Sequence, residues 1–337
     1  MEKTQISMYQ LYKDMLDNYL QSKSEHALYA AQQFSKKMME NDMSPEEMVS
    51  LHMSVFQEMV PELPEEVVDS FDLLLEVMIG YGLAYREHLS LKDRQRELES
   101  ELNVAAQMQQ SLLPQEPLNT DEIDIGVISV PAGKMSGDYY HFIRDDNGCL
   151  GLAVADVIGK GVPAAMCMSM IKYAMDSIPE QRLQPAALLE NLNRVVERNI
   201  DSNMFITMVY GTYDPRDHRF YYAGAGHEPG FYYSAATDSF EELTTKGLVL
   251  GLTPKVSYAE YVKDVQPGDF FVLLSDGVTE CRTEGEFIER EQITEMIHKY
   301  SHLPAQEIVN RVYRELEKMQ DFQLRDDFTL LILRRSV

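Results

Sequence analysis

The first 85 residues carry apolar side chains at a helical spacing. Residues that recur every three or four positions share one face of a helix, and four successive groups of this kind occur. The groups are Met8, Tyr12, Met15 and Tyr19; Ala27, Ala31 and Phe34; Met48, Leu51, Val55 and Met59; and Val67, Phe71, Leu74, Leu75 and Met78. Ser44-Pro45-Glu46-Glu47 offers an N-cap serine and a capping-box glutamate before the third group. The pattern predicts a four-helix bundle or a dimerising half-bundle.

Residues 86–119 are more polar and predict a linker helix that Pro114 ends. A heptad frame with Leu91, Leu98, Ala105 and Leu112 at position d puts Gln95, Leu102 and Gln109 at position a. Two interpretations stay open. The segment is either a parallel two-stranded coiled coil weakened by polar a positions, or a single amphipathic helix packed on the domain that follows.

From about residue 120 the apolar pattern changes to short strands separated by turns. The predicted strands are Ile123–Val130, Leu150–Ala155, Phe205–Tyr213, Phe220–Ala225, Gly230–Tyr233, Phe270–Leu274 and Thr329–Leu333. The predicted helices are Pro163–Ile178, Pro185–Ile200, Glu289–Tyr300 and Pro304–Met319. Runs of strands interrupted by pairs of helices favour a layered α+β fold over a regular βαβ alternation.

One stretch of this region, Leu150–Met166, ends an uncharged strand on an acid. Asp156 follows the strand directly, and Gly159 and Gly161 allow a tight turn into the helix that begins at Val162. The G-K-G sequence in this turn has neither spacing of the phosphate-binding glycine loops. Taken alone, Asp156 is more simply a helix cap or turn residue.

Three further acidic positions change that balance. Asp276 also follows an apolar strand, Asp138 follows a flexible Ser-Gly pair, and Asp326 and Asp327 come just before the last strand. Hard divalent cations such as Mg²⁺ and Mn²⁺ take oxygen ligands and need only a few carboxylates in a shared cleft. The four positions therefore predict a two-metal site.

Five stretches in order, GDYYHF, ADVIGKGVPAAM, GAGHEP, LLSDGVTE and RDDFTLLIL, resemble the motifs of a known enzyme family. The family is the SpoIIE group of metal-dependent, type 2C-like serine/threonine phosphatases, and the resemblance covers about residues 120–337. It implies a layered α/β/β/α sandwich of two antiparallel sheets. The N-terminal helices add a resemblance to the branch that activates the general stress response in Gram-positive bacteria.

The resemblance also implies roles for single residues. Asp156 would bridge two Mn²⁺ or Mg²⁺ ions with the Val157 carbonyl also coordinated, Asp138 would bind the second metal, and Asp276 and Asp326 would complete the first. Asp327 would support this shell. Asp156 and Asp276 would thereby act in catalysis through water activated by the metals, with no covalent nucleophile.

Four other residues are weaker candidates. His227, in GAGHEP, is either a general acid for the leaving serine oxygen or a loop histidine that fixes a glycine turn, and the second reading is the more usual. Lys160 and Arg325 are candidate phosphate contacts. His141 stands where many relatives carry an acid, which puts in doubt any additional metal ligand at that position.

The amino-acid composition disfavours some classes of binding partner. Thirty lysines and arginines against 55 acids give a net charge of −25, which disfavours nucleic acid and anionic membranes as ligands. No uninterrupted run of about 18 apolar residues occurs, so we expect a cytoplasmic protein. The three cysteines, Cys149, Cys167 and Cys281, are widely spaced and predict buried free thiols.

The sequence therefore predicts an α+β chain of three parts. Residues 1–85 form an all-α dimerisation and activator-binding domain, residues 86–119 a linker helix, and residues 120–337 a metal-dependent phosphatase domain. The resemblance implies a phosphorylated STAS-type anti-anti-sigma factor as substrate and a kinase-like switch protein as activator of a homodimer. The alternatives are a catalytically weak signalling scaffold and a two-metal phosphodiesterase.

Overall fold

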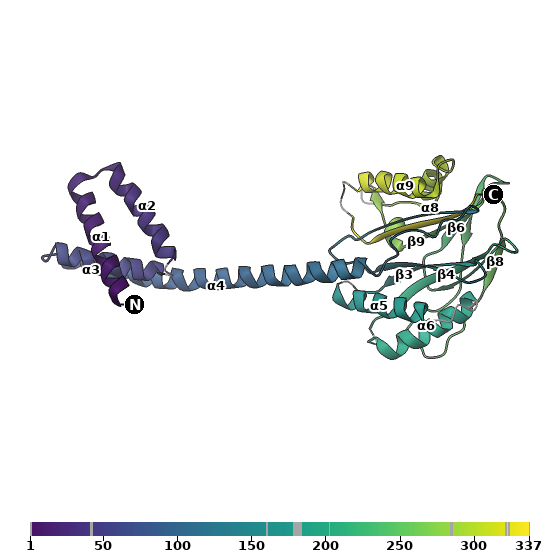
Figure 1. Cartoon of the computed structure of the whole chain (residues 1–337), viewed down its shortest axis with the longest axis horizontal. Helices are drawn as coiled ribbons and strands as arrows, with labels where there is room; N and C mark the ends of the chain where they lie inside the picture. The colour runs from purple at the N-terminus through teal and green to yellow at the C-terminus, as the bar shows by residue number, and fades with distance from the viewer. Residues whose placement is uncertain are drawn as a thin grey trace. The chain divides into compact units, whose positions relative to one another are not determined.

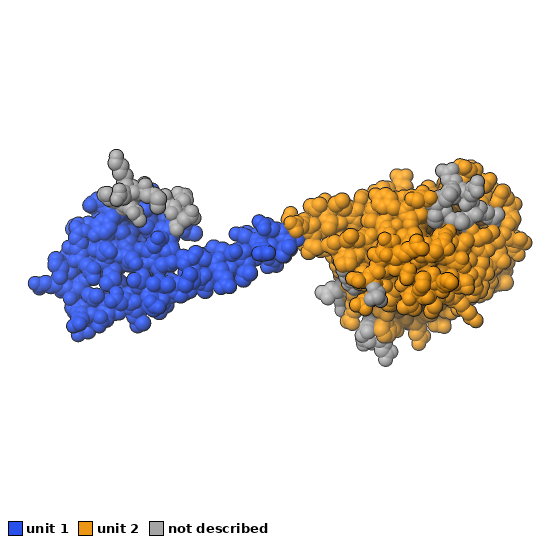
Figure 2. Space-filling model, turned by 90° about the horizontal axis from the view of Figure 1, so that it is seen from below, with its two compact units in different colours: residues 1–99 blue, residues 100–337 orange. Residues whose placement is uncertain are grey.

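The computed structural model describes residues 2–40, 43–159, 161–177, 184–201, 203–283, 286–320, 322 and 324–336. The chain divides into two compact units, residues 1–99 and 100–337 (Figure 2). The division lies within the predicted linker. No helix in the described ranges combines the length and the apolar composition needed to cross a membrane.

Unit 1 is helical, as predicted. Its helices are α1 (Glu2–Ser22), α2 (Glu25–Glu40), α3 (Pro45–Met59) and the first part of α4 (Glu65–Gln110). The apolar faces meet in a small core of Met8, Tyr12, Phe34, Met38 and Val55. The predicted capping box is present at α3, because Ser44 Oγ accepts from the Glu47 N–H and the Glu47 carboxylate accepts from the Ser44 N–H.

The predicted fourth helix and linker helix are one continuous helix of 46 residues, α4. Leu91 and Leu98 are exposed along it, as the d positions of an unpaired coiled coil would be. Its last turn belongs to unit 2 and differs, because Gln109 is buried against the phosphatase domain. The predicted heptad seam therefore stops before Gln109, whose amide finds buried backbone partners instead.

Unit 2 contains two five-stranded antiparallel sheets in its described part (Figure 1). The first has the order β1 (Ile123–Val130), β12 (Phe328–Arg335), β9 (Phe270–Leu274), β6 (Gly230–Ser234), β7 (Ser239–Leu243). The second has the order β2 (Asp138–Arg144), β3 (Leu150–Val157), β4 (Ile206–Asp214), β5 (Arg219–Ala225), β8 (Tyr261–Asp264). A two-stranded ribbon, β10 (Arg282–Thr283) with β11 (Glu286–Phe287), follows the short helix α7 (Asp276–Thr279).

Three apolar layers hold this unit together and confirm the α/β/β/α sandwich. The two sheets meet face to face around residues such as Leu152, Phe271 and Leu331. The outer face of the second sheet packs on α5 (Val162–Asp176) and α6 (Pro185–Asn199). The outer face of the first packs on α8 (Arg290–Lys299) and α9 (Ala305–Met319).

The predicted helices agree with α5, α6, α8 and α9 to within two residues at each described end, and Ile178 lies outside the described residues. The prediction missed β2, β7 and β8, as well as the two-residue strands β10 and β11. The polar residues Asp138 and His141 interrupt the apolar pattern of β2. β7 and β8 are largely polar. β2, β7 and β8 are all edge strands, where strong apolar alternation is not required.

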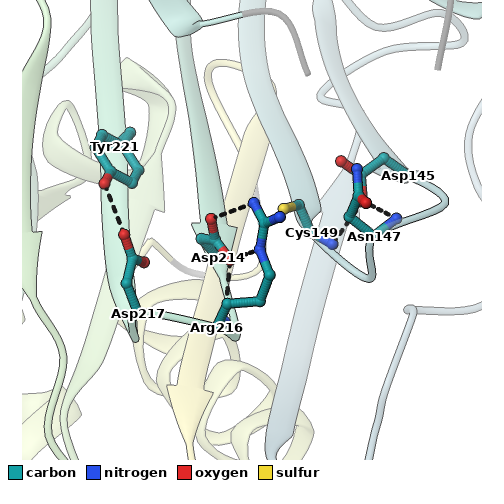
Figure 3. Close-up of polar contacts among 7 residues, drawn as sticks. All are labelled: Asp145, Asn147, Cys149, Asp214, Arg216, Asp217 and Tyr221. Atoms are coloured by element: carbon teal, nitrogen blue, oxygen red, sulfur yellow. Dashed lines mark hydrogen bonds and ion pairs between the residues drawn. The ribbon is translucent and has the colours of Figure 1, made fainter. Parts of the chain in front are cut away.

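Polar contacts fix the turns at one end of the second sheet (Figure 3). Asp145 accepts from the backbone N–H groups of Asn147 and Cys149, and the buried Asp214 carboxylate receives the Arg216 guanidinium at 2.9 and 3.0 Å. The strand register places these turns at the end opposite Asp156. Local hydrogen bonds therefore stabilise the turns at this end of the second sheet, which is remote from Asp138 and Asp156.

Candidate active site

Asp138 and Asp156 lie opposite each other on neighbouring strands. Asp138 is the first residue of β2, Asp156 is the penultimate residue of β3, and the antiparallel register pairs them directly. Side chains of directly paired residues share one face of the sheet, with Cβ atoms about 4.5–5.5 Å apart. Two carboxylates far apart in sequence are thus brought within reach of one cation.

Glycines allow the chain to come close to this pair. A Cβ atom on Gly137 would stand 2.9 Å from both Asp156 Oδ1 and the Val157 carbonyl oxygen, so no side chain fits there. After β3, Gly159 and Gly161 both have positive φ values, 115° and 80°, and Gly161 is the N-cap of α5. The tight turn predicted after Asp156 is confirmed.

The first sheet contributes a second pair of acids. Asp276 opens α7 directly after β9, and Asp326 stands two residues before β12. Because β9 and β12 are paired, with Leu274 opposite Leu330, both acids leave the sheet at the same end. Each is partly exposed, as a ligand with one side open to substrate would be.

The electrostatics confirm that like charges converge here. Burial, together with the charges of Asp156 and Asp327, raises the pKa of Asp138 well above its ordinary value, although hydrogen bonds from Ser275 and Thr329 oppose this. Burial and the charge of Asp326 likewise raise the pKa of Asp276. Asp138 and Asp276, the two acids whose pKa is raised, therefore each lie close to at least one other carboxylate.

Asp327 has a different task from Asp326. Its side chain is 4 % exposed, and its two oxygens accept from the N–H groups of Ala132 (2.8 Å) and Gly137 (2.6 Å). It therefore closes the loop that leads into Asp138. This arrangement supports the predicted division of the doublet, with Asp326 as ligand and Asp327 as its neighbour in a supporting position.

Two residues join the sheets beside the acids. Ser275 Oγ, fully buried, donates to Asp138 Oδ2 at 2.6 Å and accepts from the Thr329 N–H. His227 Nδ1 lies 2.8 Å from Thr207 Oγ1 on β4, and Nε2 lies 3.1 Å from the Leu274 carbonyl oxygen on β9. The sequence analysis missed Ser275, although its place next to Asp276 was a signal.

The hydrogen bonds of His227 favour a structural role over that of a general acid. A ring with Nε2 donating to a carbonyl and Nδ1 accepting from a threonine hydroxyl is neutral. Burial lowers the pKa of His227 to about 4, which keeps it neutral at physiological pH. It has no proton to give to a leaving group without breaking the bond to Leu274.

The three remaining candidates differ in where they lie. His141 faces α5, because it shares the face of Tyr139 rather than that of Asp138, and its Nε2 lies 3.2 Å from Asp176 Oδ1. Arg325 is exposed beside Asp326. Lys160 falls outside the described residues.

The donor set fits divalent cations with many water ligands. Within the described ranges, no three histidine, cysteine, aspartate or glutamate side chains converge as a ready-made metal-binding group. The carboxylates meet in pairs instead, and Mg²⁺ in particular binds through one or two carboxylates while keeping several waters. The raised pKa values of the buried Asp138 and the partly exposed Asp276 are what neighbouring carboxylates produce, and a bound cation would offset this repulsion.

The fold recurs in solved structures. The SiaA-PP2C domain of Pseudomonas aeruginosa aligns with a TM-score of 0.62 at 20% identity, over 72% of this chain and 98% of that one. The PP2C phosphatase domain of SpoIIE from Bacillus subtilis, with a fragment of its regulatory domain, aligns with a TM-score of 0.54 at 17% identity, over 81% and 99%. At these identities the likeness establishes the fold alone.

Sequence comparison establishes the family. Residues 146–336 match the family described as stage II sporulation protein E (SpoIIE), and residues 10–84 match the N-terminal domain of phosphoserine phosphatase RsbU. Phosphoserine phosphatase RsbU of Bacillus subtilis (strain 168) is 52% identical over 328 residues, which cover 97% of this chain and 98% of that protein. The chain belongs to the RsbU family of phosphoserine phosphatases, with a SpoIIE-type catalytic domain.

Proposed function

We propose that this phosphatase hydrolyses the phosphoserine of a STAS-type anti-anti-sigma factor with two divalent cations, Mn²⁺ or Mg²⁺, and water. Asp138 and Asp156, with the Val157 carbonyl, would hold one cation, and Asp156, Asp276 and Asp326 the other. The observation that carries the proposal is the direct pairing of Asp138 with Asp156, next to a second acidic pair from the other sheet.

When bound, the cations neutralise the phosphoryl oxygens and lower the pKa of water. The chain itself supplies rigidity. Ser275 holds one oxygen of Asp138, and Asp327 holds the loop before it, so the carboxylate does not rotate freely. His227 ties β4, which pairs with β3, to β9 two residues before Asp276. These bonds fix the two acidic pairs relative to each other before substrate arrives.

Purified protein with a serine-phosphorylated STAS-domain protein tests this proposal. We expect phosphate release that stops when EDTA removes the metal and returns with added Mn²⁺, because the proposed reaction depends on water activated by the bound cations. Bis-p-nitrophenyl phosphate is the control substrate for a phosphodiesterase. Release that persists in EDTA, or faster hydrolysis of the diester than of the phosphoprotein, would contradict the proposal.

Unit 1 is the proposed receptor for a kinase-like switch protein, within a homodimer. A cavity of about 440 Å³ lies between α1, α3 and α4, and its lining combines apolar side chains with the acids Glu46 and Glu47. The remaining lining residues are Met8, Tyr9, Met43, Ser50, Leu51, Ser54, Leu75 and Ile79. On α4, Leu73, Val77 and Tyr81 are exposed and spaced as one helix face, which supports a dimer contact.

Changing Leu51→Lys at this cavity should remove stimulation by the switch protein and leave unstimulated phosphate release unchanged. A lysine there replaces apolar contact with a charge that a docking partner would have to desolvate. Val60→Lys, an apolar-to-lysine change at an exposed position outside the cavity lining, is the matched control. Normal stimulation of the Leu51 variant would argue against this receptor site, and a monomeric full chain in sedimentation would argue against the dimer.

A further inference from the structure

Gln109, in the last turn of α4, is buried among exposed neighbours. Its side chain is 5 % exposed, whereas Gln107, Met108 and Gln110 point into solvent. Both ends of its amide are used within unit 2. Nε2 donates to the Ser136 carbonyl at 2.6 Å, and Oε1 accepts from the Ser136 N–H at 2.9 Å. Met168 Sδ on α5 lies 2.8 Å from Nε2.

This amide pair holds the residue two positions before Asp138. Ser136 Oγ in turn accepts from the Asp138 N–H at 3.0 Å, and the intervening Gly137 N–H is held by Asp327. Ser275 then fixes the Asp138 carboxylate itself. Ser136, Gly137 and Asp138 are thus each held by a different side chain where the chain enters β2. The side chain that holds Ser136 comes from α4, which lies outside both sheets.

We infer that Gln109 is a positioning residue for Asp138, which sets the backbone from which this carboxylate reaches its cation. The inference rests on the proposed role of Asp138 as a metal ligand. A single side chain that satisfies both backbone groups of Ser136 leaves that residue no independent movement relative to α4. A shift of the last turn of α4 therefore moves the start of β2, and the last turn of α4 is functionally part of the metal site.

Gln109→Met tests the inference. Methionine has nearly the same length and keeps the packing on Met168, but it removes both hydrogen bonds to Ser136. In a calorimetric Mn²⁺ titration of the metal-free full chain, we expect affinity to fall by about 10- to 100-fold, the range for groups that orient metal ligands. Saturating Mn²⁺ should restore most of kcat. Gln110→Met, the same change at an exposed neighbour, should alter neither quantity.

A second variant covers the case in which Gln109→Met folds poorly. Gln109→Glu keeps an acceptor for the Ser136 N–H but turns a carboxylate oxygen toward the Ser136 carbonyl, so it should also weaken Mn²⁺ binding. Asp138→Asn in the same titration tests the metal assignment separately from the role of Gln109. If Asp138→Asn weakens binding and neither Gln109 variant does, Gln109 only supports the fold and the inference is overturned. If Asp138→Asn leaves binding unchanged, the metal assignment itself fails.

Discussion

Asp156→Asn should abolish Mn²⁺-dependent phosphate release and at the same time stabilise the metal-free protein. The loss of rate should exceed about 100-fold, the upper end for groups that merely support ligands, because Asp156 is the proposed ligand of both cations. The gain in stability follows from electrostatics. Asp156 is one of the charges that raise the pKa of the buried Asp138, so its removal relieves a repulsion that the folded chain otherwise bears.

Thermal unfolding in EDTA and phosphate release in Mn²⁺ measure the two effects on the same preparation. Asp217→Asn is the matched control, since it removes one negative charge from the same sheet at the opposite end, among the turns of Figure 3. It should leave the rate unchanged. A near-normal rate for Asp156→Asn, or a large loss of metal-free stability, would contradict the assignment.

The same substitution at the adjacent acids Asp326 and Asp327 should affect metal-free stability differently. Asp326→Asn should lose metal-dependent activity without losing metal-free stability, because the asparagine oxygen can still accept from the Asp327 N–H while the charge that raises the pKa of Asp276 is gone. Asp327→Asn places an NH₂ group against a backbone N–H of Ala132 or Gly137. A buried donor left unpaired costs about 1–3 kcal/mol, so its unfolding temperature in EDTA should fall.

Activity alone does not distinguish these two residues, because a displaced loop before Asp138 would also slow catalysis. The pair of unfolding temperatures does. Should Asp327→Asn unfold like the unchanged protein while Asp326→Asn unfolds early, the ligand and the supporting residue are the reverse of the assignment made here.

The acids were predictable because each stands in a recognisable local pattern. Asp156 and Asp276 each come at the end of an uncharged apolar run, which is typical of a strand buried on both faces. Their convergence was not visible in any one segment. It depends on the pairing of β2 with β3 and of β9 with β12, and the first of these pairs includes a strand that the apolar pattern did not indicate.

Gln109 shows the opposite case. A glutamine at helical spacing among exposed residues looks the same in sequence whether it faces solvent, a partner helix or a buried backbone segment. Its role depends on Ser136, 27 residues further along the chain, and on a loop whose conformation is fixed by Asp327 from the far end of the domain. Long-range backbone partners of this kind leave no periodic pattern, so the sequence left open whether Gln109 faces a partner helix or the following domain. The structure places it against that domain.

The pairing of β1 with β12 has a consequence for synthesis on the ribosome. β12 lies between β1 and β9, so the first sheet cannot close until the last residues of the catalytic domain have been translated. The helices of unit 1 meet in a core formed within the first 99 residues, which are translated before the catalytic domain. A nascent chain would therefore carry the helices of unit 1 well before β12 completes the first sheet of its catalytic domain.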